Sequence, residues 1–185
     1  MPLPARRSPG EAALLADEII VLDHGRVLQA GTRGAIFHAP GSPQVAALLG
    51  IANTHRGVTV ARDRILSDSI EIDASTGDLA ALTQVLWCVR SDSVCLRPDG
   101  RYAATLIDDV DLGTVRELTL ALEDTLHLTL RYAETQRFEI GQSLRLDLAP
   151  EQISVWPLVA ANVDASSAAN GAQPQRTAVP EESVC

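Results

Sequence analysis

Histidines are the residues of this sequence whose chemistry could most readily serve a metal ion or a proton transfer. They are His24, His38, His55 and His127. Their spacing matches no metal-ligand pattern, and no serine–histidine–aspartate or cysteine–histidine arrangement suggests a nucleophilic site. We expect His24 in a turn, His38 at a helix end and His55 in a linker. His127 is expected to be exposed on the polar face of a strand, with an interface role as the alternative.

A second group of reactive side chains is the acidic stretch Asp108-Asp109-Val110-Asp111. Carboxylates this close together could hold a cation. A calcium loop needs the order Asp-x-Asp-x-Asp-Gly, which is missing here. We therefore predict a solvated acidic loop and no metal site.

Phosphate chemistry of the P-loop type is excluded by composition. All fifteen basic residues are arginines. A P-loop has the sequence G-x-x-x-x-G-K-[ST], in which the lysine reaches the β- and γ-phosphates. No other glycine-rich phosphate cradle is present either. We predict that these 185 residues do not hydrolyse ATP.

Charge and cysteine usage limit the partners and the compartment. The net charge of −9 argues against a nucleic-acid or anionic-membrane surface, since both need a basic face. Cys88, Cys95 and Cys185 are an odd number without metal spacing, which favours a reduced, cytoplasmic setting. We expect Cys88 and Cys95 to be buried or half-buried. No apolar run reaches the roughly 18 residues of a membrane span, so no direct membrane insertion is expected.

Short elements are predicted before residue 50. They are a helix over 8–16, a buried strand over 19–22, a turn over 23–26, a return strand over 27–31, and two helices capped by Thr32 and Ser42. Residues 19–22 are consecutive apolar and mostly β-branched, in a run too short for a helix. Gly25 can adopt the positive φ that a tight turn requires.

Alternation with period two dominates from residue 57 onward. The clearest case is a pair of leucine-faced runs, 118–122 and 126–132, which predict a hairpin around Glu123-Asp124-Thr125. Further strands are predicted near residues 57–60, 69–73, 86–96, 103–107, 143–148 and 153–156. Many short strands with glycine and proline turns indicate a small antiparallel barrel. The predicted class is mainly β with a small α/β N-terminal piece.

The N-terminal piece resembles a known segment of ABC-type import ATPases. Glu11-Ala12, Ala16-Asp17, Gly25-Arg26 and Gly31-Thr32 match, in order and spacing, the run that follows the switch histidine of that family. The switch histidine and its aspartate would fall at Arg7 and Ser8, which depart from the pattern. Residues 1–50 thus look like the end of a nucleotide-binding domain.

The remainder resembles the OB-like TOBE domain that follows in importers for molybdate, sulfate, polyamines and ferric iron. The matching motifs are Gly50-x-x-Asn53-x-x-x-Gly57, Val89-Arg90-Ser91-Asp92 and the stretch from Gly141 to Trp156. In the second motif Ser91 stands where proline is usual. The resemblance covers about residues 11–157 and implies a TOBE-like (MOP-like) barrel domain over 51–158. The composition after Pro157 predicts a disordered tail over 159–185.

The resemblance also implies a function. We expect a non-catalytic, regulatory C-terminal portion of an importer ATP-binding protein, with the ATPase core before residue 1 and ATP as the cofactor of full-length relatives only. Implied partners are a second copy through the barrel, ABC ATPase subunits and a permease at the inner face of the cell membrane. Some relatives bind oxyanions, and the candidate ligand-binding residues are Thr54, Arg56, Ser91 and Ser93. The alternatives are a free-standing molybdate- or tungstate-binding module and a purely structural pairing domain.

Overall fold

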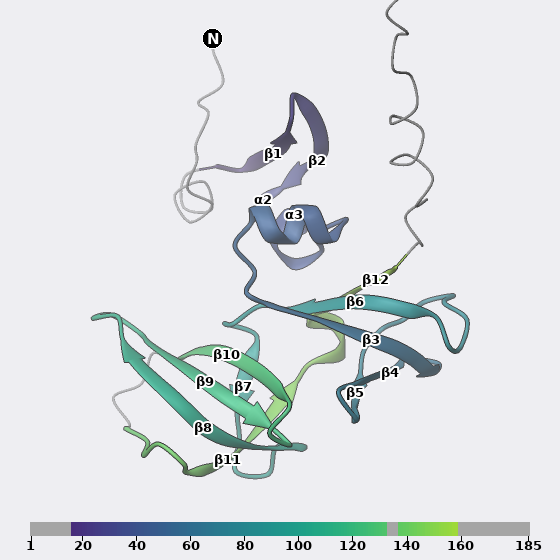
Figure 1. The fold of residues 1–185 in the computed structure, drawn as a ribbon. Helices are drawn as coiled ribbons and strands as arrows, with labels where there is room; N and C mark the ends of the chain where they lie inside the picture. The colour runs from purple at the N-terminus through teal and green to yellow at the C-terminus, as the bar shows by residue number, and fades with distance from the viewer. Residues whose placement is uncertain (1–15, 133–136, 159–185) are drawn as a thin grey trace, which may run out of the picture.

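The computed structural model describes residues 16–132 and 137–158 and is drawn in Figure 1. Nearly all of the helix expected over 8–16, and the tail expected over 159–185, lie outside these ranges. The described chain consists of a β-hairpin, two short helices and two five-stranded antiparallel sheets. None of the helices in these ranges is long and apolar enough to cross a membrane.

The N-terminal unit follows the order expected from the sequence. Its elements are β1 (Glu18–Asp23), β2 (Arg26–Thr32), α2 (Arg33–His38) and α3 (Pro43–Leu48). His24 and Gly25 join the strands with φ of 45° and 76°, as a tight hairpin turn requires. The hydroxyl of Thr32 accepts from the Ala35 N–H at 3.3 Å, and Ser42 caps α3 in the same way. The predicted helix starts are therefore confirmed.

The hairpin is covered on one face only. Val21 packs against Ile36 of α2 and Val45 of α3. Ile20 and Leu22 point away from this cluster and are 48% and 58% exposed. The prediction over 19–22 is correct about the strand but wrong about its burial, because no part of the described chain covers the second face of this two-stranded sheet.

The first large sheet has the order β12-β6-β3-β4-β5. Its strands are β3 (Asn53–Ala61), β4 (Arg64–Ser67), β5 (Ile70–Asp73), β6 (Gln84–Val89) and β12 (Ile153–Pro157). Strand β3 begins four residues earlier than expected, because its first residues pair with β6 from Asn53 onward. Strand β4 had no clear alternation in the sequence and was not predicted.

The second large sheet has the order β10-β9-β8-β11-β7. Its strands are β7 (Val94–Leu96), β8 (Tyr102–Asp111), β9 (Arg116–Leu122), β10 (Leu126–Tyr132) and β11 (Ser143–Leu148), and a 3-10 turn, η1 (Pro150–Gln152), leads into β12. The leucine-faced hairpin is confirmed as β9–β10, with Leu122 opposite Leu126. Its inward leucines are almost fully buried.

Both sheets enclose one hydrophobic core. Trp87 and Ile72 of the first sheet are fully buried in the same cluster as Leu106, Leu120 and Leu128 of the second. In Figure 1 the first sheet lies beneath α2 and α3, and the second sheet lies at the lower left. The mainly β class and the small antiparallel barrel are confirmed.

The side chain of Asn53 joins the two sheets where β3 begins. Its Nδ2 donates to the Thr129 carbonyl and its Oδ1 accepts from the Thr129 N–H, both at 2.7 Å. Thr129 lies on β10, the edge strand of the second sheet, so the amide takes the place of a paired strand residue. At another edge, the Asp73 N–H on β5 donates to the Tyr102 hydroxyl at 3.2 Å.

The entry motif Gly50-x-x-Asn53-x-x-x-Gly57 has a physical basis. Gly50 ends α3 with φ of 74°, a conformation that a side chain would disfavour. A Cβ on Gly57 would stand 2.9 Å from the Leu66 carbonyl oxygen, so only glycine lets β4 approach β3 there. Asn53 supplies the link to β10, so each residue of the motif has a distinct role in joining the helices to the barrel.

Candidate functional site

An open cleft of about 690 Å³ lies where helix α2 meets the barrel. Its polar wall consists of Arg33, His38, Arg90, Ser91, Asp92, Glu117 and Arg131. Its apolar wall consists of Phe37, Leu49, Ile51 and Ala52. The cleft thus combines several charged groups with carbon surface, as small-molecule sites do.

Two ion pairs hold two of the three arginines of the cleft, Arg90 and Arg131, in place. Arg90 donates through Nε to Asp92 Oδ1 at 2.8 Å and through Nη2 to Asp92 Oδ2. The hydrogen bond from Arg90 holds the pKa of Asp92 below its ordinary value. Arg131 stands directly opposite Glu117 on the β9–β10 hairpin, and its Nε lies 3.3 Å from Glu117 Oε2.

A backbone contact brings these two pairs to one place. The Arg131 N–H donates to the Ser91 carbonyl at 2.9 Å, which fixes β10 against the turn between β6 and β7. Arg90 and Asp92 flank Ser91 in that turn. The two guanidinium groups therefore belong to elements that are connected through Ser91.

The four candidate ligand-binding residues fall in two regions. Ser91 lines the cleft. Ser93 lies in the same turn, where its hydroxyl is 3.4 Å from Gln152 Oε1. Thr54 and Arg56 are exposed on β3, and neither lines the cleft. The structure thus places Ser91 in the cleft and Ser93 next to it, where the Ser93 hydroxyl also donates to Asp92 Oδ1 at 3.5 Å.

The segment that contains α2 and the loop after it is also hydrogen-bonded to η1 and β12. Gln152 Oε1 accepts from His38 Nδ1 at 3.3 Å as well as from Ser93. Trp156 Nε1 donates to the Pro40 carbonyl at 3.2 Å. His38 lies in the last turn of α2, as expected. These contacts close the side of the junction formed by η1 and β12.

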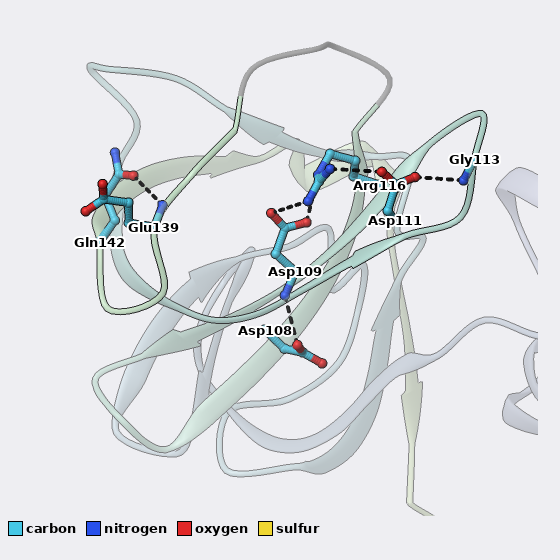
Figure 2. A network of polar contacts seen from close by, with 7 residues as sticks. All are labelled: Asp108, Asp109, Asp111, Gly113, Arg116, Glu139 and Gln142. Carbon is cyan, nitrogen blue, oxygen red and sulfur yellow. Dashed lines mark hydrogen bonds and ion pairs between the residues drawn. The ribbon is translucent and has the colours of Figure 1, made fainter.

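The acidic stretch is part of β8 and not a loop. Figure 2 shows Arg116 of β9 between Asp109 and Asp111. Its Nε and Nη2 donate to the two Asp109 oxygens at 2.9 and 2.8 Å, and its Nη1 donates to Asp111 at 3.2 Å. The side chain of Asp109 is only 7% exposed, so the prediction of a solvated loop is wrong there. The pairing with β9 extends β8 to Asp111. The positive charge of Arg116 offsets the negative charge of Asp109 and Asp111.

Replacing Asp109 by asparagine is expected to destabilise the protein more than replacing Asp111 by asparagine. The change at Asp109 removes its charge and one of its two acceptors for Arg116 at a side chain that is only 7% exposed, whereas the Asp111 side chain is 58% exposed and makes one hydrogen bond to Arg116. Urea unfolding of the two variants provides the comparison. Equal urea midpoints for the two variants would show that the contacts of Asp109 with Arg116 stabilise the protein no more than the contact of Asp111 does.

His55 lies inside β3 and not in a linker, because that strand begins at Asn53. Its ring packs on Trp87 with the centroids 5.1 Å apart. Nε2 of His55 and Nε1 of Trp87 are buried without a hydrogen-bond partner among the described residues. Burial lowers the pKa of His55; Asp68 opposes this effect and His127 adds to it. His127 itself is exposed, as predicted, and so is His24.

The lowered pKa of His55 predicts a loss of stability in mild acid. The unfolded chain binds a proton near the ordinary pKa of 6.5, whereas the folded chain binds it only at lower pH. The contribution is therefore fully present above 6.5 and is lost as the pH falls toward the folded pKa. We expect His55→Gln to weaken the dependence of the unfolding free energy on pH below 6.5. The same pH dependence in the variant and the parent protein would contradict this.

The two described cysteines differ in environment. Cys88 is buried, and burial raises its pKa to about 11. Cys95 is exposed on β7, so the expectation of burial is wrong for this residue because its side chain points to the outer face of a short strand. Among the described residues no group of three or more histidine, cysteine, aspartate or glutamate side chains could hold a metal ion.

Known proteins that are similar to this chain include importer ATP-binding proteins. No family model matches the sequence. The spermidine/putrescine import ATP-binding protein PotA of Clostridium acetobutylicum is 26% identical over 147 residues, which is 78% of this chain and 41% of PotA. The sulfate/thiosulfate import ATP-binding protein CysA of Nitrosomonas europaea is 29% identical over 161 residues, which is 82% of this chain and 44% of CysA. This chain resembles the C-terminal part of ABC-type importer ATPases. It spans less than half the length of either relative.

A solved structure supports the OB-like fold. The cytoplasmic molybdate-binding protein ModG aligns with a TM-score of 0.51 and 18% identity, over 56% of this chain and 94% of ModG. At this identity the likeness concerns the fold alone.

Proposed function

We propose that this chain acts as the regulatory, non-catalytic C-terminal portion of an importer ATP-binding protein. The observation that carries the proposal is the extent of the match to PotA. A match over 78% of this chain cannot fit into the residues after Gly50, so it includes part of the hairpin–helix unit as well as the barrel. In the proposed arrangement, the hairpin–helix unit continues an ATPase domain and the barrel supplies the regulation.

The bare face of the β1–β2 hairpin supports this proposal. Leu22 and Val27 stand opposite each other in the hairpin and are 58% and 62% exposed, with Ile20 beside them. Grouped apolar side chains of this kind commonly mark an interaction surface. In the proposed setting, the ATPase core covers them. ATP would then be bound outside these 185 residues, since they contain no lysine for a P-loop.

The test is a chimera in which residues 16–158 replace the matching segment of Clostridium acetobutylicum PotA. We expect a folded, ATP-binding chimera whose stability depends on the hairpin face. A second chimera with Ile20→Asp and Leu22→Asp should lose the ATPase-core contact and unfold at lower temperature, whereas the same changes should cost the isolated chain little. The proposal would be overturned if the chimera with Ile20→Asp and Leu22→Asp unfolded at the same temperature as the first chimera. ATP hydrolysis by the isolated chain would also overturn it.

A free-standing oxyanion-binding module is the second candidate, favoured by the likeness in fold to ModG. Thr54, Arg56, Ser91 and Ser93 remain its proposed ligand-binding residues. Thermal unfolding of the isolated chain with molybdate, tungstate and sulfate distinguishes the two functions, because a ligand that binds the folded state raises the melting temperature. Saturable stabilisation by one oxyanion favours the module. The first proposal also includes a permease partner, self-association through the barrel and a place at the inner membrane face.

A further inference from the structure

We propose that the cleft between α2 and the barrel binds a small organic anion that carries at least two negative charges. The proposal concerns Arg90, Arg131 and Ser91 on one wall and Phe37 and Ile51 on the other. Anion binding by the cleft can be measured on the isolated chain, so this proposal does not depend on the assignment of the chain to an importer. Only the role of the anion as an effector rests on the proposed function.

The charge of the cleft differs from that of the whole chain. The chain carries a net charge of −9, whereas in the cleft wall Arg90 and Arg131 each face one carboxylate, Asp92 and Glu117, so that these four charges balance. Two guanidinium groups gathered in a concave site of an acidic protein can attract a small anion.

The guanidinium groups keep donors available for a ligand. Arg90 uses Nε and Nη2 for Asp92, which leaves Nη1. Arg131 uses Nε for Glu117, and no hydrogen bond from either of its Nη atoms to another described residue was found. A guanidinium has five N–H donors, so each group can bind a carboxylate or phosphate while it keeps its present partner. The existing ion pairs hold these donors in position before the ligand arrives.

Size and apolar surface decide between an inorganic and an organic anion. The cleft volume of about 690 Å³ falls in the range of roughly 300–1,000 Å³ that small organic ligands occupy. A tetrahedral oxyanion has the size of a few water molecules, each about 30 Å³, and would leave most of the cleft filled with solvent. The ring of Phe37 and the side chain of Ile51 offer contacts to a carbon skeleton that an oxyanion cannot use.

The position of the cleft suggests what binding would do. Its walls come from α2, from the linker between α3 and β3, from the turn between β6 and β7, and from β9 and β10. An anion held between α2 and Arg131 would add contacts between the N-terminal unit and the barrel. In the proposed function, such a ligand would favour the arrangement of the two units seen here and thereby act on the ATPase.

Calorimetric titration with phenyl phosphate and with inorganic phosphate tests the inference. The two probes share the anionic group, and phenyl phosphate adds a ring for the apolar wall. We expect saturable binding of phenyl phosphate, with affinity reduced about tenfold by Arg131→Ala, the size of a lost charge-assisted hydrogen bond. Glu117→Gln should tighten binding, since it removes a competing carboxylate. If the ion pair between Arg131 and Glu117 only stabilised the fold, Arg131→Ala and Glu117→Gln would not change the affinity for phenyl phosphate in opposite directions.

Arg62→Ala is the matched control. It removes the same charge from a side chain that is 90% exposed and lies outside the cleft. Unchanged affinity in this variant, together with the opposite effects of the other two, supports the site. Equal weakening in Arg62→Ala and Arg131→Ala would reduce the effect to net charge and overturn the proposal. Failure to bind phenyl phosphate would also overturn it and would leave the chimera test unaffected.

Discussion

Replacing Asn53 by alanine is expected to lower the free energy of unfolding by about 3 kcal/mol. The change leaves the N–H and the carbonyl of Thr129 without their partner at the junction of the two sheets, where Asn53 is only 2% exposed. Each buried backbone group that loses its hydrogen bond costs about 1–3 kcal/mol. Guanidinium chloride unfolding followed by tryptophan fluorescence measures the loss, since Trp87 lies in the core.

Two further variants separate the hydrogen bonds from other effects of the change. Asn53→Asp keeps the acceptor but places an oxygen opposite the Thr129 carbonyl, so we expect a loss at least as large. Thr54→Ala alters the neighbouring exposed residue and should cost little. If Asn53→Ala and Thr54→Ala unfold at the same denaturant concentration, the link between the sheets does not stabilise the barrel.

Replacing Gly100 by alanine is expected to cost about 2–3 kcal/mol, the upper range for overpacking a core. A Cβ at this position would stand 2.7–2.8 Å from the backbone of Leu146. Backbone atoms of a paired strand cannot move aside as a flexible side chain can. The turn that contains Gly100 would have to shift away from β11, and the hydrogen bond from Arg145 Nε to its carbonyl would weaken.

Gly34→Ala serves as the opposite case. Gly34 lies in helix α2, and a Cβ there would meet no atom within 4 Å. Alanine favours a helix over glycine by about 1 kcal/mol, so this variant should be slightly more stable than the parent. Thermal unfolding of both variants provides the comparison. A Gly100→Ala protein as stable as the parent would show that the approach of the turn to β11 is not tight.

The sequence predicted the elements that local pattern controls. The β9–β10 hairpin was visible because its leucines alternate over both strands, and the caps at Thr32 and Ser42 were visible from residue type alone. The exposure of one face of β1 could not be predicted from local pattern. An apolar strand indicates that some partner covers it, but it does not show whether that partner belongs to the same chain, and Leu22 is exposed here.

The candidate site was only partly visible in the sequence. Ser91 was identified through a motif, whereas Arg131 and Glu117 were missed, although their opposite charges face each other in a hairpin whose register could be derived. The burial of Asp109 depends on Arg116, and this partner could be inferred only by extending the pairing of β8 with β9. Contacts between the helices and the barrel, such as His38 with Gln152, link residues far apart in sequence and leave no periodic signal.

The link between Asn53 and Thr129 also has a kinetic consequence. Strands β8, β9 and β10 pair consecutively and can form early, whereas the Asn53 link joins residues 76 positions apart. Contacts that form after the rate-limiting step change the rate of unfolding and leave the rate of folding nearly unaltered. The Asn53→Ala protein should therefore refold at almost the parental rate and unfold about a hundredfold faster. The lifetime of the closed barrel, more than the ease of forming it, would then depend on this one amide.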